Sequence, residues 1–371
     1  MTKVEEEINK GKELSIVNLV QYLIEYAHSF RASDIHIDPS EKEINIRFRI
    51  DGMLVSRFTF SKKIHEEIIL RIKVLSAIRT DIHLSPLDGR FKVNIQNEFI
   101  DLRVSIMPTY YGESVVLRIL SQSLNDSSLG LLGMSQANIE ILTSSLIKPC
   151  GMILVTGPTG SGKTTTLYTI LKILNTADRS LVTLEDPIEY SIKGVKQIQV
   201  HPDAGLTFSK GLRSILRQDP NIIMLGEIRD SETAQIIVGT ALTGHIVISS
   251  LHTSDSVSAI PRLIDMKVEP YLVASTVHTI IAQRLVRKIC MHCNRSGCDK
   301  CSQTGFKGRI GIYEVLKVNT EIRDAISKSP SLNELRSLAI KSGMQTILED
   351  GLEKVRAGLT SKEEILRVIH E

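Results

Sequence analysis

A run of small and basic residues in the middle of the chain has the types and the spacing that bind phosphate groups. It comprises Gly157, Pro158, Thr159, Gly160, Ser161, Gly162, Lys163 and Thr164, and it satisfies the pattern G-x-x-x-x-G-K-[ST] at every fixed position. Its glycines let the backbone curl, so that successive N–H groups point at phosphate oxygens. Lys163 supplies a positive charge to the β- and γ-phosphates, and the hydroxyl of Thr164 is a ligand for Mg²⁺. These residues therefore predict a site for a nucleoside triphosphate with Mg²⁺.

The residues on either side of this loop support the prediction. An apolar run at 152–155 is typical of a buried parallel strand, and Leu167, Ile170, Leu171 and Leu174 recur with the spacing of one helix face. A strand that enters the loop and a helix that leaves it place the phosphates at a helix N-terminus. Free N–H groups and the helix dipole favour anions there. The alternative is a glycine-rich turn without a ligand.

Two acidic segments that follow other apolar runs predict the groups that act on water. Glu227 ends the run 222–226 as in a Walker B element, with Gly-Glu in place of the usual Asp, so it holds Mg²⁺ through water or orients the water. Glu185 opens the segment 185–189, whose carboxylates are costly beside a phosphate site unless a cation or a water is present. We predict Glu185 as the base, with Glu227 as the alternative. The interpretations without function are a charged turn and a surface glutamate.

Two histidines bracket the next apolar run. His245 precedes the run 246–250 and His252 follows it, so this strand could relay the state of the γ-phosphate across the sheet. Both histidines are therefore predicted to sense phosphate. The alternative is that each is a structural residue, as lone histidines often are.

The cysteines predict a metal site. Most of them lie within a short segment as two C-x-x-C pairs, formed by Cys290, Cys293, Cys298 and Cys301. Four thiolates close a tetrahedral Zn²⁺ site and leave no open position for chemistry, so the predicted zinc is structural and staples a hairpin. The gap between the pairs is shorter than the ~15–20 residues of a common zinc ribbon, which indicates a tight local clip. Disulfides or free thiols are the alternatives, His292 could compete as a ligand, and Cys150 is predicted to be a core thiol.

Length and composition limit the number of domains, the class of partner and the location of the protein. With 371 residues, 42% of them hydrophobic and 23% charged, the chain has material for two domains with ordinary cores. A net charge of +3 and 4% aromatic residues without tryptophan do not favour nucleic acid as a direct partner. The start of the chain lacks the basic and apolar regions of a secretory signal, and no stretch approaches the ~20 apolar residues of a membrane span. We therefore predict a cytoplasmic protein that associates peripherally with the cytoplasmic membrane through partners.

The helices and strands that position these residues fall into two parts of the chain, which differ in their order of secondary structure. Residues 1–120 predict a small α+β domain, with helices over 14–30 and 63–78 and strands over 44–50, 53–55, 91–96, 99–106 and 115–120. A polar stretch without periodicity marks a linker over 121–133.

The second part, residues 134–371, predicts an α/β domain. Helical segments alternate with apolar runs at 152–156, 180–184, 222–226 and 246–250, which is typical of a mostly parallel sheet with helices on both faces. Further helices are expected over 331–371, beyond the cysteine clip at 290–301.

The order of these motifs resembles the ATPases of type II secretion, type IV pilus assembly and natural competence. In that family the segments correspond to the Walker A loop, an Asp box at 185–189, a Walker B element at 226–230 and a His box at 243–253. The small N-terminal domain of the family is matched by 32–36, 47–52 and 88–90, and its C-terminal part by 309–314. The resemblance covers nearly the whole chain.

This resemblance implies a RecA-like P-loop ATPase core with a small PAS-like N-terminal domain, in a ring of six copies that acts with a polytopic platform protein of the inner membrane. It also implies that nucleotide is held between the small domain and the phosphate loop, where Arg103 and Arg118 reach the phosphates and act in catalysis. The alternative is that these arginines alternate along strands and face solvent.

Within the family, the cysteine clip favours an assembly ATPase, because the retraction branch typically lacks it. The short N-terminal part resembles the competence ATPases of Gram-positive bacteria, so we predict a pseudopilus motor for DNA uptake. Type II secretion and type IV pilus extension are the alternatives within this branch. A pilus-retraction ATPase and an unrelated P-loop helicase are the alternatives of another kind.

Overall fold

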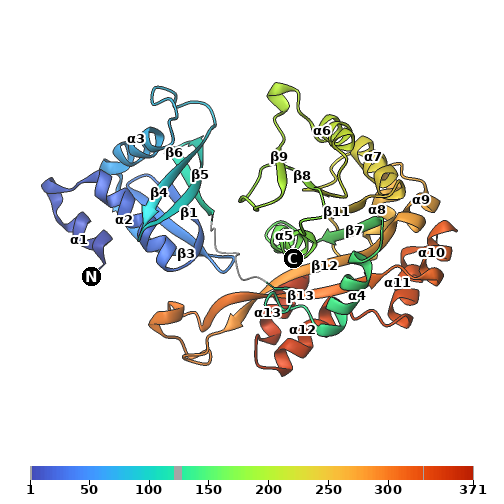
Figure 1. Ribbon diagram of the computed structural model, residues 1–371. Helices are drawn as coiled ribbons and strands as arrows, with labels where there is room; N and C mark the ends of the chain where they lie inside the picture. The colour runs from blue at the N-terminus through green and yellow to red at the C-terminus, as the bar shows by residue number, and fades with distance from the viewer. Residues whose placement is uncertain (1, 121–127, 329, 371) are drawn as a thin grey trace. The chain divides into compact units, whose positions relative to one another are not determined.

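The computed structural model describes residues 2–120, 128–328 and 330–370. The chain divides into two compact units, Met1–Asn125 and Asp126–Glu371, each with a β-sheet and its own hydrophobic core (Figure 1). The strands of the first sheet are antiparallel, and most strands of the second are parallel.

The first unit is a six-stranded sheet, in the order β3-β2-β1-β6-β5-β4, with two helices on one face. Its strands are β1 Ala32–Pro39, β2 Glu43–Ile50, β3 Met53–Ser61, β4 Leu87–Ile95, β5 Glu98–Thr109 and β6 Gly112–Leu120. Its helices are α1 Lys3–Asn9, α2 Ile16–Ser29 and α3 His65–Leu75. Alternation explains the packing: Ile44, Ile46 and Phe48 of β2 are fully buried among side chains of α2 and α3, so Arg47 and Arg49 lie on the other face.

Two hairpin turns follow the residue types that the sequence places there. Asp51 and Gly52, between β2 and β3, have φ values of +48° and +88°, and Gln96 and Asn97, between β4 and β5, have +52° and +68°. Two consecutive left-handed residues are the signature of the type I′ turn, which suits the twist of antiparallel strands. Each turn joins two strands that the sequence predicts, 44–50 to 53–55 and 91–96 to 99–106. Strand β1 was not expected, although Ile35 and Ile37 alternate with polar residues and are buried.

The second unit is a seven-stranded sheet in the order β13-β12-β7-β11-β10-β8-β9, with helices on both faces. Its strands are β7 Gly151–Thr156, β8 Leu181–Glu185, β9 Lys196–Gln199, β10 Ile222–Leu225, β11 Ile246–Leu251, β12 Val277–Ile289 and β13 Phe306–Lys317. Its helices are α4 Gln136–Leu146, α5 Lys163–Leu174, α6 Phe208–Ile215, α7 Ser231–Leu242, α8 Ala259–Asp265, α9 Pro270–Thr276, α10 Thr320–Ser327, α11 Leu332–Lys341, α12 Ile347–Arg356 and α13 Lys362–His370. Side chains of α4 and α5 cover one face of the sheet, and those of α6 to α9 the other.

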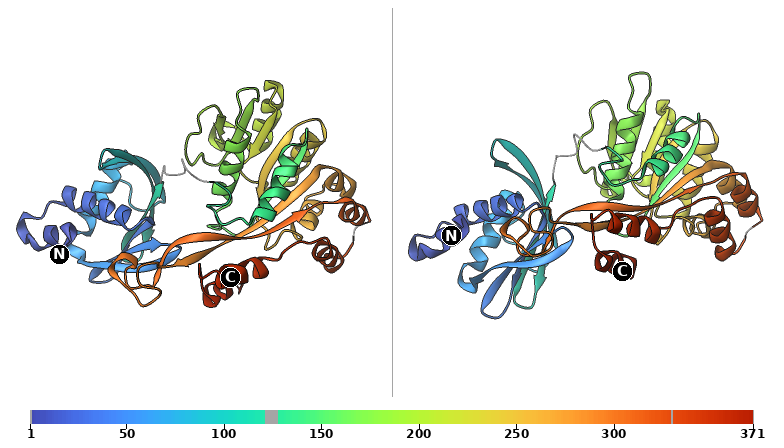
Figure 2. Two further views of the ribbon diagram at one scale, coloured as in Figure 1. Left: turned by 60° about the horizontal axis from the view of Figure 1, so that its bottom comes forward. Right: turned by 90° about the horizontal axis from the view of Figure 1, so that it is seen from below.

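Strands β12 and β13 continue past the sheet as a two-stranded antiparallel ribbon (Figure 2). Strand β12 pairs with β7 only up to Ala282, and beyond that residue it pairs with β13 alone. The loop between the two strands carries the cysteine cluster, and α12 and α13 pack against the ribbon through Ile347, Ile365 and Val368. This ribbon was not among the predicted strands, because the apolar runs with a βαβ pattern end near residue 250.

Part of the expected linker belongs to the second unit. Residues 121–127 of the predicted linker 121–133 lie outside the described residues, whereas Leu129 is buried and the carbonyl of Leu132 accepts hydrogen bonds from Gly311 and Tyr313. The linker prediction is therefore wrong for residues 129–133, because Leu129 and Leu132 pack into the core of the second unit beside β13. No helix in the described part of the chain is both long and apolar enough to cross a membrane.

Candidate active site

The phosphate loop connects the end of β7 to the start of α5. Gly157, Gly160 and Gly162 have φ values of +145°, +79° and +90°, so the loop takes the left-handed conformations that its glycines allow. Space demands glycine as well: a Cβ on Gly157 would lie 2.5 Å from the carbonyl oxygen of Gln283, and one on Gly162 would lie 2.7 Å from its Nε2. No side chain caps the N-terminus of α5, so N–H groups of its first turn are available to an anion.

Lys163 lies over this loop and keeps a positive charge near neutral pH. Its Nζ donates hydrogen bonds to the carbonyls of Gly157 and Pro158, at 2.8 and 3.0 Å. Burial lowers the pKa of Lys163 to about 8, although the nearby Glu227 raises it and Arg284 lowers it further. Nearby polar groups also fit a nucleotide: Ser161 is buried and its hydroxyl has no hydrogen-bond partner among the described residues.

Glu227 lies beyond the end of β10 and is held by two basic side chains. Its Oε1 accepts a hydrogen bond from Arg229 at 2.5 Å, and its Oε2 accepts one from Nε2 of His252 at 3.1 Å. Burial raises the pKa of Glu227, but the bonds from Arg229 and His252 outweigh it, so the pKa is lowered overall. Arg229 also donates to Asp186 at 3.0 Å. Glu227 is therefore an ionised carboxylate, fixed in orientation and 21% exposed.

Glu185, at the end of β8, lies in a different environment. It is only 3% exposed, and its carboxylate accepts hydrogen bonds from Thr183 at 2.6 Å, from Gln197 at 3.3 Å and from the hydroxyl of Tyr168. Burial raises the pKa of Glu185 more than these bonds lower it. The three donors connect β8 and β9 to α5, the helix that follows the phosphate loop. This geometry favours a structural role for Glu185 over the predicted role as the base.

The two predicted phosphate-sensing histidines lie at opposite ends of β11. His252 follows the strand and contacts Glu227, and the neighbouring Thr253 exchanges hydrogen bonds with Thr156 at the start of the loop. His245 precedes the strand, where its Nδ1 donates to the carbonyl of Thr240 and its own carbonyl accepts from Gly151. Six residues of strand separate the two, about 20 Å at 3.3 Å per residue. The structure thus brings His252 to the loop and leaves His245 at the far edge of the sheet.

Strand β12 adds residues that the sequence did not single out. Gln283 is buried beneath the loop and its Oε1 accepts a hydrogen bond from Thr166 at 2.7 Å. Arg284 donates to the carbonyls of Gln283 and Ser254, at 3.1 and 2.7 Å, and so connects β12 to the loop after His252. No local motif marks either residue, because the parallel pairing of β12 with β7 is what brings them to the loop.

The arginines predicted to act on phosphates belong to the first unit. Arg103 of β5 and Arg118 of β6 are direct cross-strand partners, so they lie side by side on one face of the antiparallel sheet. The Nε of Arg118 donates to Asp34 of β1 at 2.9 Å, and its side chain is 60% exposed.

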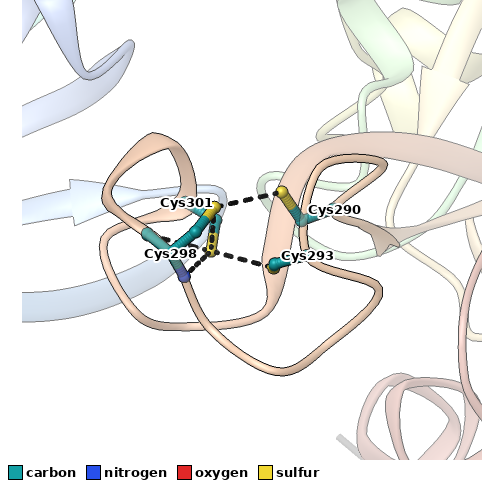
Figure 3. A group of neighbouring side chains, drawn as sticks. All are labelled: Cys290, Cys293, Cys298 and Cys301. Carbon is teal, nitrogen blue, oxygen red and sulfur yellow. Dashed lines mark hydrogen bonds between the residues drawn. The ribbon is translucent and has the colours of Figure 1, made fainter.

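The four clustered cysteines converge at the end of the ribbon (Figure 3). Their sulfur atoms lie within 4.8 Å of one another, with separations of 3.8 Å for Cys290–Cys298, 3.7 Å for Cys293–Cys301 and 3.6 Å for Cys298–Cys301. Four sulfurs around one Zn²⁺ at about 2.3 Å stand about 3.8 Å apart, whereas a disulfide requires about 2.05 Å. The donor set and its spacing therefore fit a tetrahedral Zn²⁺ site. Cys150 lies outside this group and is only partly buried.

Oxygen donors at the loop fit Mg²⁺, a hard cation that prefers them. Thr164 is exposed in the first turn of α5, and Glu227 and Ser161 add a carboxylate and a hydroxyl nearby. The residues present therefore suit a nucleotide bound with Mg²⁺.

The chain is similar to known proteins along nearly its whole length. The chain matches the family model described as type II/IV secretion system protein over residues 9–367. The type II secretion system protein E of Pectobacterium carotovorum subsp. carotovorum is 43% identical, over 98% of this chain and 78% of the relative. The type IV pilus assembly ATPase PilB of Thermus thermophilus is 40% identical, over 98% of this chain and 44% of the relative. The solved structure of the pilus retraction motor PilT with bound ADP aligns with a TM-score of 0.68 at 27% identity and covers 94% of this chain and 96% of that one.

Proposed function

The chain belongs to the type II/IV secretion system protein family and is an ATPase, and we propose that it powers the assembly of a pilus or pseudopilus at the cytoplasmic membrane. One observation carries the proposal: relatives named for type II secretion and for type IV pilus assembly match 98% of this chain, which itself carries a complete phosphate loop and Glu227. Type II secretion is the first candidate, because the relatives at 43% identity carry that name. DNA uptake, which the sequence predicts, remains the second candidate.

Lys163 and the N–H groups of the loop bind the β- and γ-phosphates in this proposal. Mg²⁺, held by Thr164 and the nucleotide, neutralises charge on the phosphates when it is bound. Glu227 accepts a hydrogen bond from the attacking water and takes its proton, because it is ionised and partly exposed. Arg229 and His252 hold the Glu227 carboxylate in place for this step. We propose Glu227 as the base, since Glu185 already accepts three hydrogen bonds in a buried position.

Arg103 and Arg118 complete the phosphate site in this proposal, as the resemblance implies. Guanidinium groups that reach the phosphates only in a closed state would make hydrolysis depend on movement of the first unit. The protein would then work as a homohexamer on a polytopic platform protein of the inner membrane. Its location in this proposal is the cytoplasm, at the surface of the membrane that holds the platform protein.

The proposal assigns the four cysteines to a structural Zn²⁺ that closes the end of the ribbon. The purified protein should contain about one zinc per chain, because a four-thiolate site has full coordination and high affinity. Cys298→Ser should lose this zinc and become sensitive to proteolysis within residues 290–305, measured by metal analysis and limited digestion. Cys150→Ser is the matched control and should keep both the zinc and the protection. A wild-type protein purified without zinc would refute the assignment.

A cell-based experiment tests the function itself. The gene is deleted and replaced by the wild type or by Glu227→Gln, and surface pili, secreted proteins and DNA uptake are measured in the same strains. We expect Glu227→Gln to abolish the same single output that the deletion abolishes, and that output identifies the system. If the deletion leaves all three outputs unchanged, the proposal is wrong.

A further inference from the structure

The loop that begins with His252 is hydrogen-bonded at its start to the end of β7. This loop comprises residues 252–258 and connects β11 to α8. The N–H of Thr253 donates to the hydroxyl of Thr156 at 2.9 Å, and the same hydroxyl lies 3.0 Å from the carbonyl oxygen of Thr253. Thr156 is the last residue of β7 and directly precedes Gly157. The 252–258 loop and the phosphate loop are therefore anchored at one place.

The ribbon strands hold the middle of the 252–258 loop. Arg284 of β12 donates to the carbonyl of Ser254 at 2.7 Å. The carboxylate of Glu314 on β13 accepts hydrogen bonds from the N–H of Ser256 at 2.9 Å and from its hydroxyl at 2.5 Å. Ser256 is fully buried and Glu314 is 3% exposed. A buried polar group that loses its partner is costly, so these bonds keep the loop in one conformation.

Helix α11 supplies a third contact through an ion pair. The Nη2 of Arg336 donates to Oδ2 of Asp255 at 2.6 Å, and Oδ1 of the same carboxylate accepts from the N–H of Ser258 at 2.8 Å. Burial raises the pKa of Asp255, but the bonds from Ser258 and Arg336 outweigh it, so the pKa is lowered overall. Asp255 is therefore an ionised carboxylate that connects the 252–258 loop to α11.

The helix that carries Arg336 is itself fixed by packing. Leu335 and Ala339 of α11 are 3% and 1% exposed and belong to the core on the side of α6 to α9. Asp255 and Arg336 are 81 residues apart in the chain. A shift of α11 would therefore displace a carboxylate that lies only three residues after His252.

We propose that Arg336 and Asp255 are positioning residues for ATP hydrolysis, and that α11 affects the rate of the chemical step through them. Their ion pair fixes the 252–258 loop, and the loop holds Nε2 of His252 at 3.1 Å from the carboxylate of Glu227. A misplacement of about 1 Å in a catalytic site can lower the rate about a hundredfold. The inference rests on the proposed role of Glu227 as the base.

Hydrolysis of ATP by the full-length protein tests the role of Arg336. Arg336→Ala should lower kcat and the single-turnover rate about fivefold, as expected for the loss of one hydrogen bond that positions the loop. KM for ATP and the affinity for ADP should stay within about twofold, because the phosphate loop and Lys163 are unchanged. Arg336→Lys keeps a charged donor for the single bond to Asp255, so its rate should lie within about twofold of wild type.

Two further variants control for unfolding and for the loss of any arginine. Asp255→Asn keeps an oxygen acceptor for the N–H of Ser258 and removes only the charge, so it should fold and lose about fivefold in rate. Arg323→Ala is the matched control for Arg336→Ala. Arg323 lies on the neighbouring α10 and its Nη2 donates to Nδ1 of His278 at 3.1 Å, so its removal should change the rate less than about twofold.

A double-mutant cycle with His252 distinguishes positioning from a purely structural role. Arg336→Ala should have no further effect on the rate in His252→Ala, because it acts through that ring. An equal effect in both backgrounds, or a rise in KM without a fall in kcat, would overturn the inference. If Arg336→Ala and Asp255→Asn hydrolyse ATP normally while Glu227→Gln does not, the inference fails alone. If Glu227→Gln also hydrolyses ATP normally, the proposed role of Glu227 fails as well.

Discussion

The two sheets of this protein arrange their charged residues in different ways. In the second unit, the phosphate loop, Glu227 and His252 each follow a parallel strand and meet at one edge of the sheet. In the first unit, arginines of the four antiparallel strands β2, β6, β5 and β4 are in register across the sheet, with Asp34 of β1 between the first two: Arg49, Arg118, Arg103 and Arg90. Parallel strands all end on the same edge, so the residues after them gather there. Antiparallel strands end alternately at both edges, so a set of charges is assembled on the face instead.

This difference predicts how strongly the substitution of each residue should affect nucleotide binding and hydrolysis. In the proposed function, groups at the strand ends act on one bond of the nucleotide, whereas Arg103 and Arg118 both act on its phosphates. We therefore expect large single effects in the parallel sheet and graded effects on the antiparallel face. The following predictions test that contrast.

The largest effect is expected at the end of β10. Glu227→Gln should lower kcat for ATP about a thousandfold, because glutamine cannot accept the proton of the attacking water. Affinity for ADP should stay within about threefold, since the loop and Lys163 are unchanged. Glu232→Gln is the control, because Glu232 lies exposed on α7 and pairs with Arg213 at 3.1 Å. Near-normal ATP turnover of Glu227→Gln would contradict the expectation that residues at the ends of the parallel strands have large single effects.

The carboxylate of Glu364, beside the ribbon of β12 and β13, should contribute to the stability of the fold and not to catalysis. Glu364 of α13 is buried, and burial raises its pKa, but hydrogen bonds from Arg287 and Arg367 outweigh this and lower the pKa to about 2. Glu364→Ala should destabilise the protein by about 3 kcal/mol, because it leaves Arg287 without its partner. Thermal or denaturant unfolding measures this, and ATP turnover of the folded variant should be unchanged.

The depressed pKa of Glu364 also has a consequence for pH. The carboxylate is ionised at lower pH in the folded state than in the unfolded state, whose pKa is about 4.3. Its stabilisation is therefore complete above that value and declines as the pH falls toward about 2. The difference in unfolding free energy between wild type and Glu364→Ala should shrink over this range. Glu363→Gln on the same helix is the control: a hydrogen bond with Ser361 lowers the pKa of Glu363 as well, but its side chain is 70% exposed, so the difference should be smaller.

The two ends of β11 give a comparison within one strand. His252→Ala should lower kcat about tenfold, since it removes one of the two groups that hold Glu227. His245→Ala should change kcat less than about twofold, because its ring binds only the carbonyl of Thr240 at the far edge. Equal losses for the two variants would instead support a relay along the strand.

The smallest effect concerns the protonation of Lys163. Its pKa of about 8 lies below the ordinary value, so the free protein loses this positive charge as the pH rises through 8. Affinity for ADP should therefore fall about threefold between pH 7.5 and 8.5, the change in the protonated fraction. Lys163→Arg binds nucleotide through a group that stays charged, so its affinity should not change over this range. A wild-type affinity independent of pH would contradict the depressed pKa.

Much of the parallel sheet could be predicted because its motifs are contiguous. The strands near 152–156, 180–184, 222–226 and 246–250 and the loop between β7 and α5 were visible as local patterns. The ribbon was not predicted. The contact of β12 with β7, which brings Gln283 and Arg284 to the loop, joins segments more than 120 residues apart and leaves no local pattern. The burial of Glu185 also could not be read from its motif, since Tyr168 and Gln197 come from α5 and β9.

The sequence by itself determined the chemistry that is local: the phosphate loop, the Glu227 carboxylate after a strand, the four clustered thiols and the family. Each depends on a few neighbouring residues whose spacing fixes their geometry. Only the tertiary structure decided which glutamate is open to water, which histidine is near the loop, and which carboxylates hold the arginines. Asp34 and Arg118 are 84 residues apart, and cross-strand pairing alone makes them partners. The reason is physical, because burial, pKa and hydrogen bonding depend on neighbours in space, and folding brings those neighbours from distant parts of the chain.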